Sequence, residues 1–171
     1  MIKKDSPPEH IRVLGIIPSS RGFGFAVMEG KNNLVDWGVK PVKGGDKNAR
    51  SLSNAANLIA HYRPNVIAIE DTQGSRRSAR VKALTKEIVA LALDENIQVK
   101  QFSRKQVNLG ILQDEQGEKH ALAKHLAACF PEELDFRLPE KRLFYKAEQY
   151  QMDYFDAVAL AQHCLRSKQQ V

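Results

Sequence analysis

Three carboxylates in this sequence have neighbours that suit them to binding a positive charge. Glu70 directly follows the apolar run VIAI at residues 66–69, and open α/β sheets place their ligands at the carboxyl ends of such buried strands. Asp153 and Asp156 are three residues apart in a predicted helix, so both side chains lie on one face. Five small or apolar residues follow Asp156, and a desolvated acid beside another acid needs a cation. The alternative is that the pair only interacts with the dipole at the helix N-terminus.

Basic residues gather in three clusters, each in or next to a predicted loop. The clusters are Arg76, Arg77, Arg80 and Lys82; Arg104 and Lys105; and Lys141, Arg142 and Lys146. The formal net charge is +6, which favours a polyanionic partner but is weak evidence alone, since solvated charge also keeps proteins soluble. Clustering of this kind is typical of contacts to a phosphate backbone. Lysines scattered for solubility are the alternative.

The elements that must position these residues follow from apolar periodicity and turn residues. Continuous apolar runs, without polar alternation, indicate strands covered on both faces. We expect strands over residues 11–17, 23–29, 34–40, 66–69 and 97–102, with Pro18, Gly22 and Gly24 marking the first turn. We expect helices from Asp46 to Tyr62, over 79–95, from Ser103 to Leu109, over 117–130 and over 151–166, with Asp46 and Ser103 as N-caps.

This order predicts an α/β fold. Three antiparallel strands are followed by right-handed βαβ crossovers, in the order βββαβαβα, which gives one five-stranded mixed sheet with helices on both faces. The chain of 171 residues suits one domain, over residues 11–171, and residues 1–10 are expected to be a flexible leader because of the pair Pro7-Pro8.

Composition excludes several classes. Hydrophobic residues make up 43% of the chain and charged residues 27%, which is ordinary for a folded globular protein. No apolar run is long enough to span a membrane, and no apolar segment follows the basic N-terminus as in a signal peptide. Cys129 and Cys164 lie far apart without CxxC spacing, so we expect two buried thiols in a reducing compartment and a cytoplasmic protein, with a disulfide or a metal-binding pair as the alternative.

Taken together in this order, these segments resemble the RuvC-type Holliday junction resolvases of the RNase H-like superfamily. Residues 14–20, LGIIPSS, look like the first-strand GIDPG/S motif of that family, and VIAIE at 66–70 looks like its second acidic motif. Residues 82–92 and 102–107 resemble the next helix and the strand-to-helix segment. Residues 117–120 and the closing pattern DxxDAVALA from Asp153 resemble the last two helices, so the likeness covers nearly the whole chain.

The resemblance implies a nuclease site. In that family four carboxylates hold two divalent metals, Mg²⁺ or Mn²⁺, which activate a water for phosphodiester cleavage. Glu70, Asp153 and Asp156 match three of the four positions. The resemblance also implies that branched DNA is the partner, that Arg76, Arg77, Arg80, Arg104, Lys105 and Lys119 face it, and that two copies form a dimer. The apolar face of the 79–95 helix is the candidate dimer surface, with burial in the core as the alternative.

One departure from the family motif bears on activity. The fourth position, that of the acid bridging both metals, falls on Ile17, and the second glycine of the motif is replaced by Ser19. A serine hydroxyl lacks the charge to replace the acid, and Asp71 is expected to face the opposite side of its strand from Glu70.

The sequence therefore leaves three hypotheses. The first is a metal-dependent endonuclease acting on Holliday-junction or other branched DNA, and the second is a catalytically inactive DNA-binding or assembly module on the same fold. A third, weaker hypothesis is a metabolic or interaction protein of the wider superfamily, for which residues 19–22, SSRG, make a poor phosphate loop.

Overall fold

A computed structural model describes residues 11–135 and 152–168. The first strands are β1 (Arg12–Ser19), β2 (Gly22–Glu29) and β3 (Leu34–Pro41), followed by helix α1 (Lys47–Tyr62) and strand β4 (Val66–Glu70). Helix α2 (Ala79–Asp94) and strand β5 (Gln98–Phe102) come next. The remaining helices are α3 (Arg104–Leu112), α4 (Lys119–Cys129), α5 (Pro131–Leu134) and α6 (Met152–Lys168). The leader at 1–10 and the basic cluster at 141–146 lie outside the described residues.

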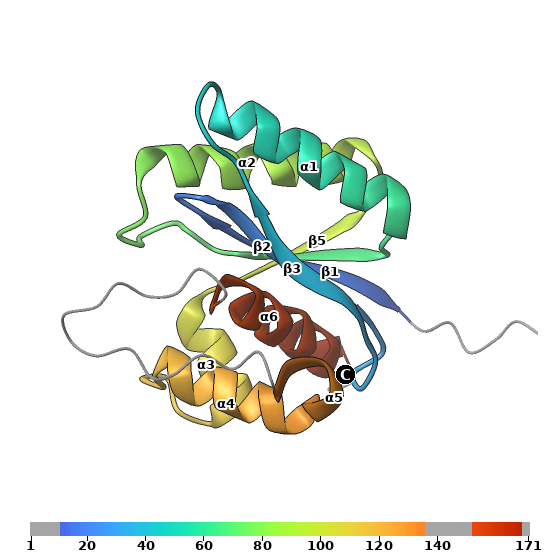
Figure 1. Ribbon diagram of the computed structural model, residues 1–171, viewed down its shortest axis with the longest axis vertical. Helices are drawn as coiled ribbons and strands as arrows, with labels where there is room; N and C mark the ends of the chain where they lie inside the picture. Colours follow the sequence, from blue (N-terminus) through green and yellow to red (C-terminus); the bar gives the residue numbers. More distant parts are fainter. Residues whose placement is uncertain (1–10, 136–151, 169–171) are drawn as a thin grey trace, which may run out of the picture.

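The five strands form one mixed sheet in the order β3-β2-β1-β4-β5. β1 pairs antiparallel with β2 and parallel with β4, and β4 pairs parallel with β5. Helices α1 and α2 cover one face of the sheet, and α3 to α6 lie on the other (Figure 1). The predicted α/β class, with helices on both faces of a mixed sheet, is confirmed.

Two hydrophobic clusters occupy the two faces of the sheet. Alternate residues of β1 divide between them: Val13 and Ile17 face the α6 side, and Leu14 and Ile16 face the α1–α2 side. The buried side chains of α2, among them Leu84 and Ile88, pack into the second cluster. The apolar face of the 79–95 helix is therefore core, so of the two alternatives for this face burial in the core is confirmed.

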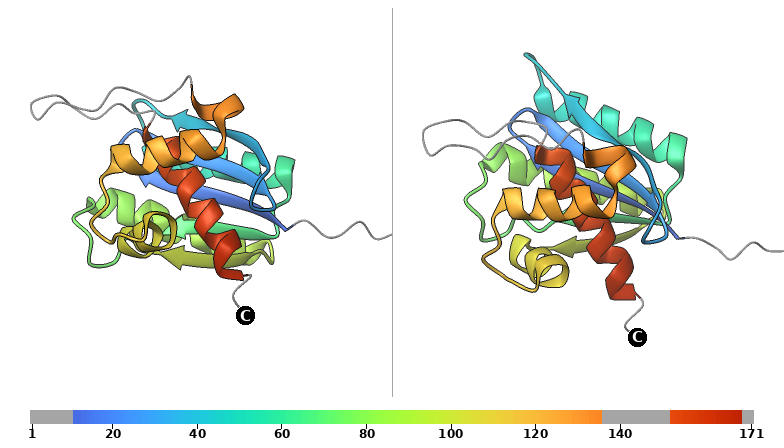
Figure 2. Two further views of the ribbon diagram at one scale, coloured as in Figure 1. Left: turned by 90° about the horizontal axis from the view of Figure 1, so that it is seen from below. Right: turned by 60° about the horizontal axis from the view of Figure 1, so that its bottom comes forward.

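Helix α6 is enclosed on nearly every side. It packs against β1 and β2 and is covered from outside by α3 and α4 (Figures 1 and 2). From Met152 to Arg166 only Asp153, Asp156, His163 and Arg166 are more than slightly exposed. An α-helix between two layers needs apolar residues all round rather than one apolar stripe, which explains the run of small and aliphatic residues after Asp156.

Strand β1 continues through Pro18 to Ser19, so the predicted turn shrinks to Ser20 and Arg21. Pro18 lies beyond Ile16, the last residue paired with β4, where a missing N–H is tolerated. Asp46 and Ser103 accept hydrogen bonds from Ala49 N and Gln106 N, which confirms both predicted N-caps.

The two cysteines differ, contrary to the expectation of two buried thiols. Cys164 is buried, whereas Cys129 is exposed at the end of α4, with its Sγ 3.6 Å from His125 Nε2.

We expect one thiol of the folded protein to react rapidly with a thiol reagent and the second to react only after unfolding. The Cys129→Ser variant is the matched control and should lose the rapid phase; two rapid thiols in the wild type would contradict the burial of Cys164.

Candidate nucleic-acid and metal site

Ile17 and Glu70 lie side by side at the carboxyl edge of the sheet. The parallel register pairs Ile16 with Ile69, so the next residue along each strand, Ile17 and Glu70, points toward the α6 side. Both line one small pocket with Asp156. Ile17 is 5% exposed and belongs to the α6-side cluster. An apolar side chain thus fills the strand position next to Glu70.

Two glycines let α6 carry its acids close to this edge. A Cβ on Gly24, the β2 partner of Ile17, would lie 2.5 Å from the backbone carbonyl of Asp153. A Cβ on Gly15 would lie 2.5 Å from the carbonyl oxygen of Ala157. The helix therefore rests directly on backbone at both positions. Ile17 consequently has Glu70 beside it on β4 and Asp153 above its β2 neighbour.

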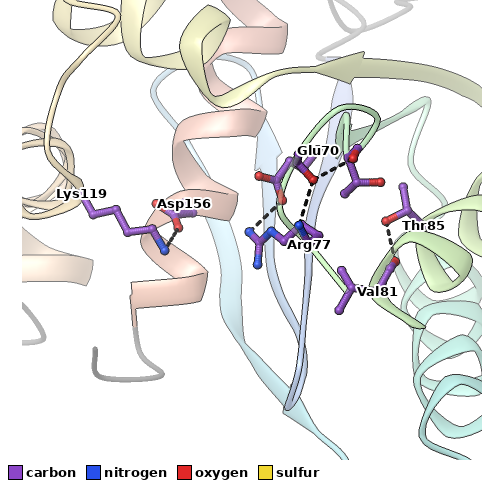
Figure 3. Close-up of polar contacts among 8 residues, drawn as sticks. Glu70, Arg77, Val81, Thr85, Lys119 and Asp156 are labelled. Atoms are coloured by element: carbon purple, nitrogen blue, oxygen red, sulfur yellow. Dashed lines mark hydrogen bonds and ion pairs between the residues drawn. The ribbon is translucent and has the colours of Figure 1, made fainter. Parts of the chain in front are cut away.

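Each acid of the pocket is held by a cation of the chain itself. Arg77 donates from Nη2 to Glu70 Oε2 at 2.8 Å, and Lys119 Nζ lies 3.4 Å from Asp156 Oδ2 (Figure 3). The carboxylate side chains are 13% and 11% exposed, so both pairs are partly shielded from water. Arg104, at the start of α3, lines the same pocket. Three cations thus surround two facing carboxylates.

Burial is the largest influence on the pKa of Glu70, which it raises above the ordinary value. The Arg77 guanidinium opposes the rise, Asp156 adds to it, and Lys119 and Arg104 oppose it further. Asp156 lines the same pocket, and its like charge disfavours the ionised form of Glu70.

No protein-family model matches the sequence, and no curated protein matches it. Several solved structures are similar to this one. RuvC of Thermus thermophilus is 15% identical over 94% of this chain and 98% of its own, with a TM-score of 0.67. The T. thermophilus RuvC in complex with Holliday junction substrate is 17% identical over 94% and 96% of the two chains, with a TM-score of 0.71. Fowlpox virus resolvase, in complex with Holliday junction DNA, is 12% identical over 91% and 99%, with a TM-score of 0.57.

The chain has the RuvC-like fold. The structural likeness spans almost the full length of both chains, and the expected RNase H-like architecture is thereby confirmed at the level of fold. At these identities the likeness concerns backbone architecture. Which ligand the carboxyl edge of this sheet can bind depends on its own side chains.

These side chains do not fit a two-metal centre. Among residues 11–135 and 152–168, no group of three or more His, Cys, Asp or Glu residues is arranged to hold a metal ion. The Ser19 hydroxyl accepts from Arg21 N and carries no charge to replace the missing acid. Asp71 accepts from Gln73 N and lines a separate groove on the α2 side, as expected for the residue that directly follows Glu70. Mg²⁺ would have to displace Arg77 and Lys119 from the carboxylates that they neutralise.

The other basic residues predicted to contact DNA divide into two kinds. Arg80 donates to Asn48 Oδ1 and to the Ser20 carbonyl, so its guanidinium ties α1 to the β1–β2 turn. Arg76 and Lys105 are exposed, in the loop after β4 and in the first turn of α3. They are the residues best placed to meet a large partner without rearrangement of the fold.

Asn108 belongs to the pocket but was missed in the sequence. It is 2% exposed, and its Nδ2 donates to the carbonyls of Glu115 and Gly117, which fixes the α3–α4 turn ahead of Lys119. Its Oδ1 lacks a hydrogen-bond partner within the described part of the chain and lines the pocket. The available signal was a polar residue between Val107 and Ile111, on the buried stripe of α3.

Proposed function

We propose that this protein binds branched DNA, with the phosphate backbone lying across the edge that contains Glu70 and Asp156. The observation that carries the proposal is the presence of three cations at this edge: Arg104 lines the pocket, and Arg77 and Lys119 contact its two carboxylates. Arginine and lysine at a concave edge bind phosphate through charge-assisted hydrogen bonds and release counterions from DNA.

Two further observations support this choice of partner. T. thermophilus RuvC and fowlpox virus resolvase, which share the fold, are each bound to Holliday junction DNA in a solved structure. The exposed Arg76 and Lys105 extend the positive surface beyond the pocket. A four-way junction is wider than a single duplex, and a spread of basic residues on separate loops suits it.

Binding should be stronger to a four-way junction than to a duplex of the same arm sequence, as measured by fluorescence anisotropy. Removing Arg76 and Lys105 together should weaken junction binding about tenfold and reduce the slope of log affinity against log salt by about 2, because each phosphate contact contributes about one unit.

Lys31→Ala is the matched control. Lys31 is exposed in the β2–β3 turn, at the opposite edge of the sheet from Glu70, so its loss should leave the affinity and the salt slope unchanged. Equal affinity for junction and duplex, or equal losses in the Lys31 and Arg76/Lys105 variants, would contradict the proposal.

A metal-dependent endonuclease is the second candidate. It is favoured by one observation, that Glu70 and Asp156 face each other across a pocket at the carboxyl edge of β4. Cleavage of four-way junctions, flaps or single strands in the presence of Mg²⁺ or Mn²⁺ would establish it. The absence of products from all three substrates with either metal would exclude it.

We also propose a homodimer, because a four-way junction has approximate two-fold symmetry that a two-fold dimer matches. The buried face of α2 cannot supply the contact. On its outer side Val89, Ala90 and Leu93 border a surface groove, and Leu93 is 59% exposed. Sedimentation equilibrium of the wild type and of Leu93→Glu tests the proposal; a monomer of the wild type at micromolar concentration would contradict it.

No helix in the described ranges is long and apolar enough to cross a membrane.

A further inference from the structure

Both carboxylates of the pocket are already paired with basic side chains, without a metal. Arg77 and Lys119 each contact a carboxylate of the pocket, and Arg104 acts electrostatically on Glu70 from the pocket wall. Two carboxylates of the pocket, Glu70 and Asp156, thus lie among three cations. A divalent ion gains binding energy only where the protein supplies net negative charge and free oxygen ligands. Here an ion would have to compete with Arg77 for Glu70 and with Lys119 for Asp156.

The central position of the edge is closed to a metal as well. Ile17, 5% exposed, lies between Glu70 on β4 and the segment of α6 that carries Asp153 over Gly24. Its side chain offers no ligand and separates the carboxylates by apolar volume. The fold is that of metal-dependent resolvases, but two features of this edge disfavour a metal. The residue between the acids is apolar, and Glu70 and Asp156 are paired with basic side chains.

The Arg77 guanidinium retains donors for an anion. One of its five N–H groups is used by Glu70, and its other guanidinium donors have no partner within the described ranges. The side chain is 29% exposed, and that of Lys119 is 27% exposed, so both cations reach the solvent side of the pocket. The carboxylates hold them in place, which lowers the entropy that each cation would lose on contacting a ligand.

We propose that this edge binds a DNA phosphate directly and without a divalent metal, through Arg77, Arg104 and Lys119, with Glu70 and Asp156 as positioning residues. The inference rests on the proposed function and adds to it how the phosphate is held. The fork of N–H groups on each arginine matches two phosphate oxygens. No covalent step is involved, since the anion binds and leaves unchanged.

The test is junction binding by fluorescence anisotropy in EDTA and in millimolar Mg²⁺ at equal ionic strength. We expect equal affinity in the two buffers. Arg77→Gln should weaken binding roughly tenfold, the scale of one charge-assisted hydrogen bond, and Arg77→Lys should recover part of the loss. Lys31→Gln, at the opposite edge, is the matched control and should change nothing.

Two further measurements keep the result unambiguous. If Arg77→Gln is too unstable to purify, Arg104→Gln carries the same expectation, because the Arg104 side chain lines the pocket. Glu70→Gln keeps an acceptor for Arg77 but loses the charge, so its loss of affinity should be smaller than that of Arg77→Gln and the same in EDTA and Mg²⁺.

The outcomes separate this inference from the proposed function. Junction binding that needs Mg²⁺ or Mn²⁺ would overturn the metal-free site and leave the DNA-binding proposal intact. Equal binding in both buffers with no effect of Arg77→Gln or Arg104→Gln would also overturn it. Absence of junction binding in either buffer would remove the proposed function and this inference together.

Discussion

Replacing Ile17 by aspartate is expected to destabilise the protein and to make its stability depend on divalent metal. The new carboxylate would be buried beside Glu70 and below α6, and an unpaired charge at such a position costs on the order of 3–5 kcal/mol. For a chain of this length that corresponds to a fall in the midpoint temperature of about 10 °C. Mg²⁺ or Mn²⁺ should recover part of the loss, because the ion supplies positive charge to the new buried carboxylate beside Glu70.

Ile17→Asn is the matched control, because the asparagine side chain has nearly the same shape as that of aspartate but carries no charge. It should also lower the midpoint temperature, through lost apolar packing and a buried amide, but Mg²⁺ should not restore it. Differential scanning fluorimetry with EDTA-treated protein measures all three chains. A wild-type midpoint that itself rises in millimolar Mg²⁺ would show that the present residues already hold a metal.

Gly24→Ala is expected to have the second large effect. Its Cβ would lie 2.5 Å from the Asp153 carbonyl, and neither β2 nor α6 can move freely because both are packed on two sides. Overpacking of this kind costs typically about 1–3 kcal/mol. Since α6 also carries Asp156, the shift should weaken junction binding as well as lower stability in urea.

Gly38→Ala provides the control within the same sheet. On β3 the added Cβ would meet the edge of the Phe25 ring, at 3.3 Å, and no backbone atom within 4 Å. Its free energy of unfolding should fall by about 1 kcal/mol at most, less than for Gly24→Ala, because a side chain yields to the added methyl group more easily than the backbone of α6 does. Equal losses of stability in the two variants would mean that the close approach of α6 is not the reason why Gly24→Ala destabilises the protein.

The sequence predicts the architecture because its local signals agree with one another. Apolar runs without alternation mark the buried strands, and β4 is found where VIAI predicts it. Asp46 and Ser103 begin their helices as their side chains predict. The orientation of Asp71 away from Glu70 follows from the two-residue period of a strand.

What the sequence could not predict depends on contacts between distant segments. The pairing of Glu70 with Arg77 depends on how the loop after β4 folds back, and that of Asp156 with Lys119 on how α4 lies over α6. The hydrogen bonds from the Arg80 guanidinium to Asn48 and to the Ser20 carbonyl join three segments that are distant in the sequence. Cys129 ends a helix whose packing turns it outward. None of these contacts produces a periodic pattern of apolar residues in the sequence, which is the signal that predicts strands and helices.

Site-specific photo-crosslinking to a four-way junction tests the central claim most directly. A photoreactive phenylalanine analogue in place of Lys105, exposed beside the pocket, should form a covalent adduct with a labelled junction in EDTA buffer. The same analogue in place of Lys31, at the opposite edge, should form none. Adducts from position 31 at equal or higher yield would place the DNA elsewhere and contradict the account.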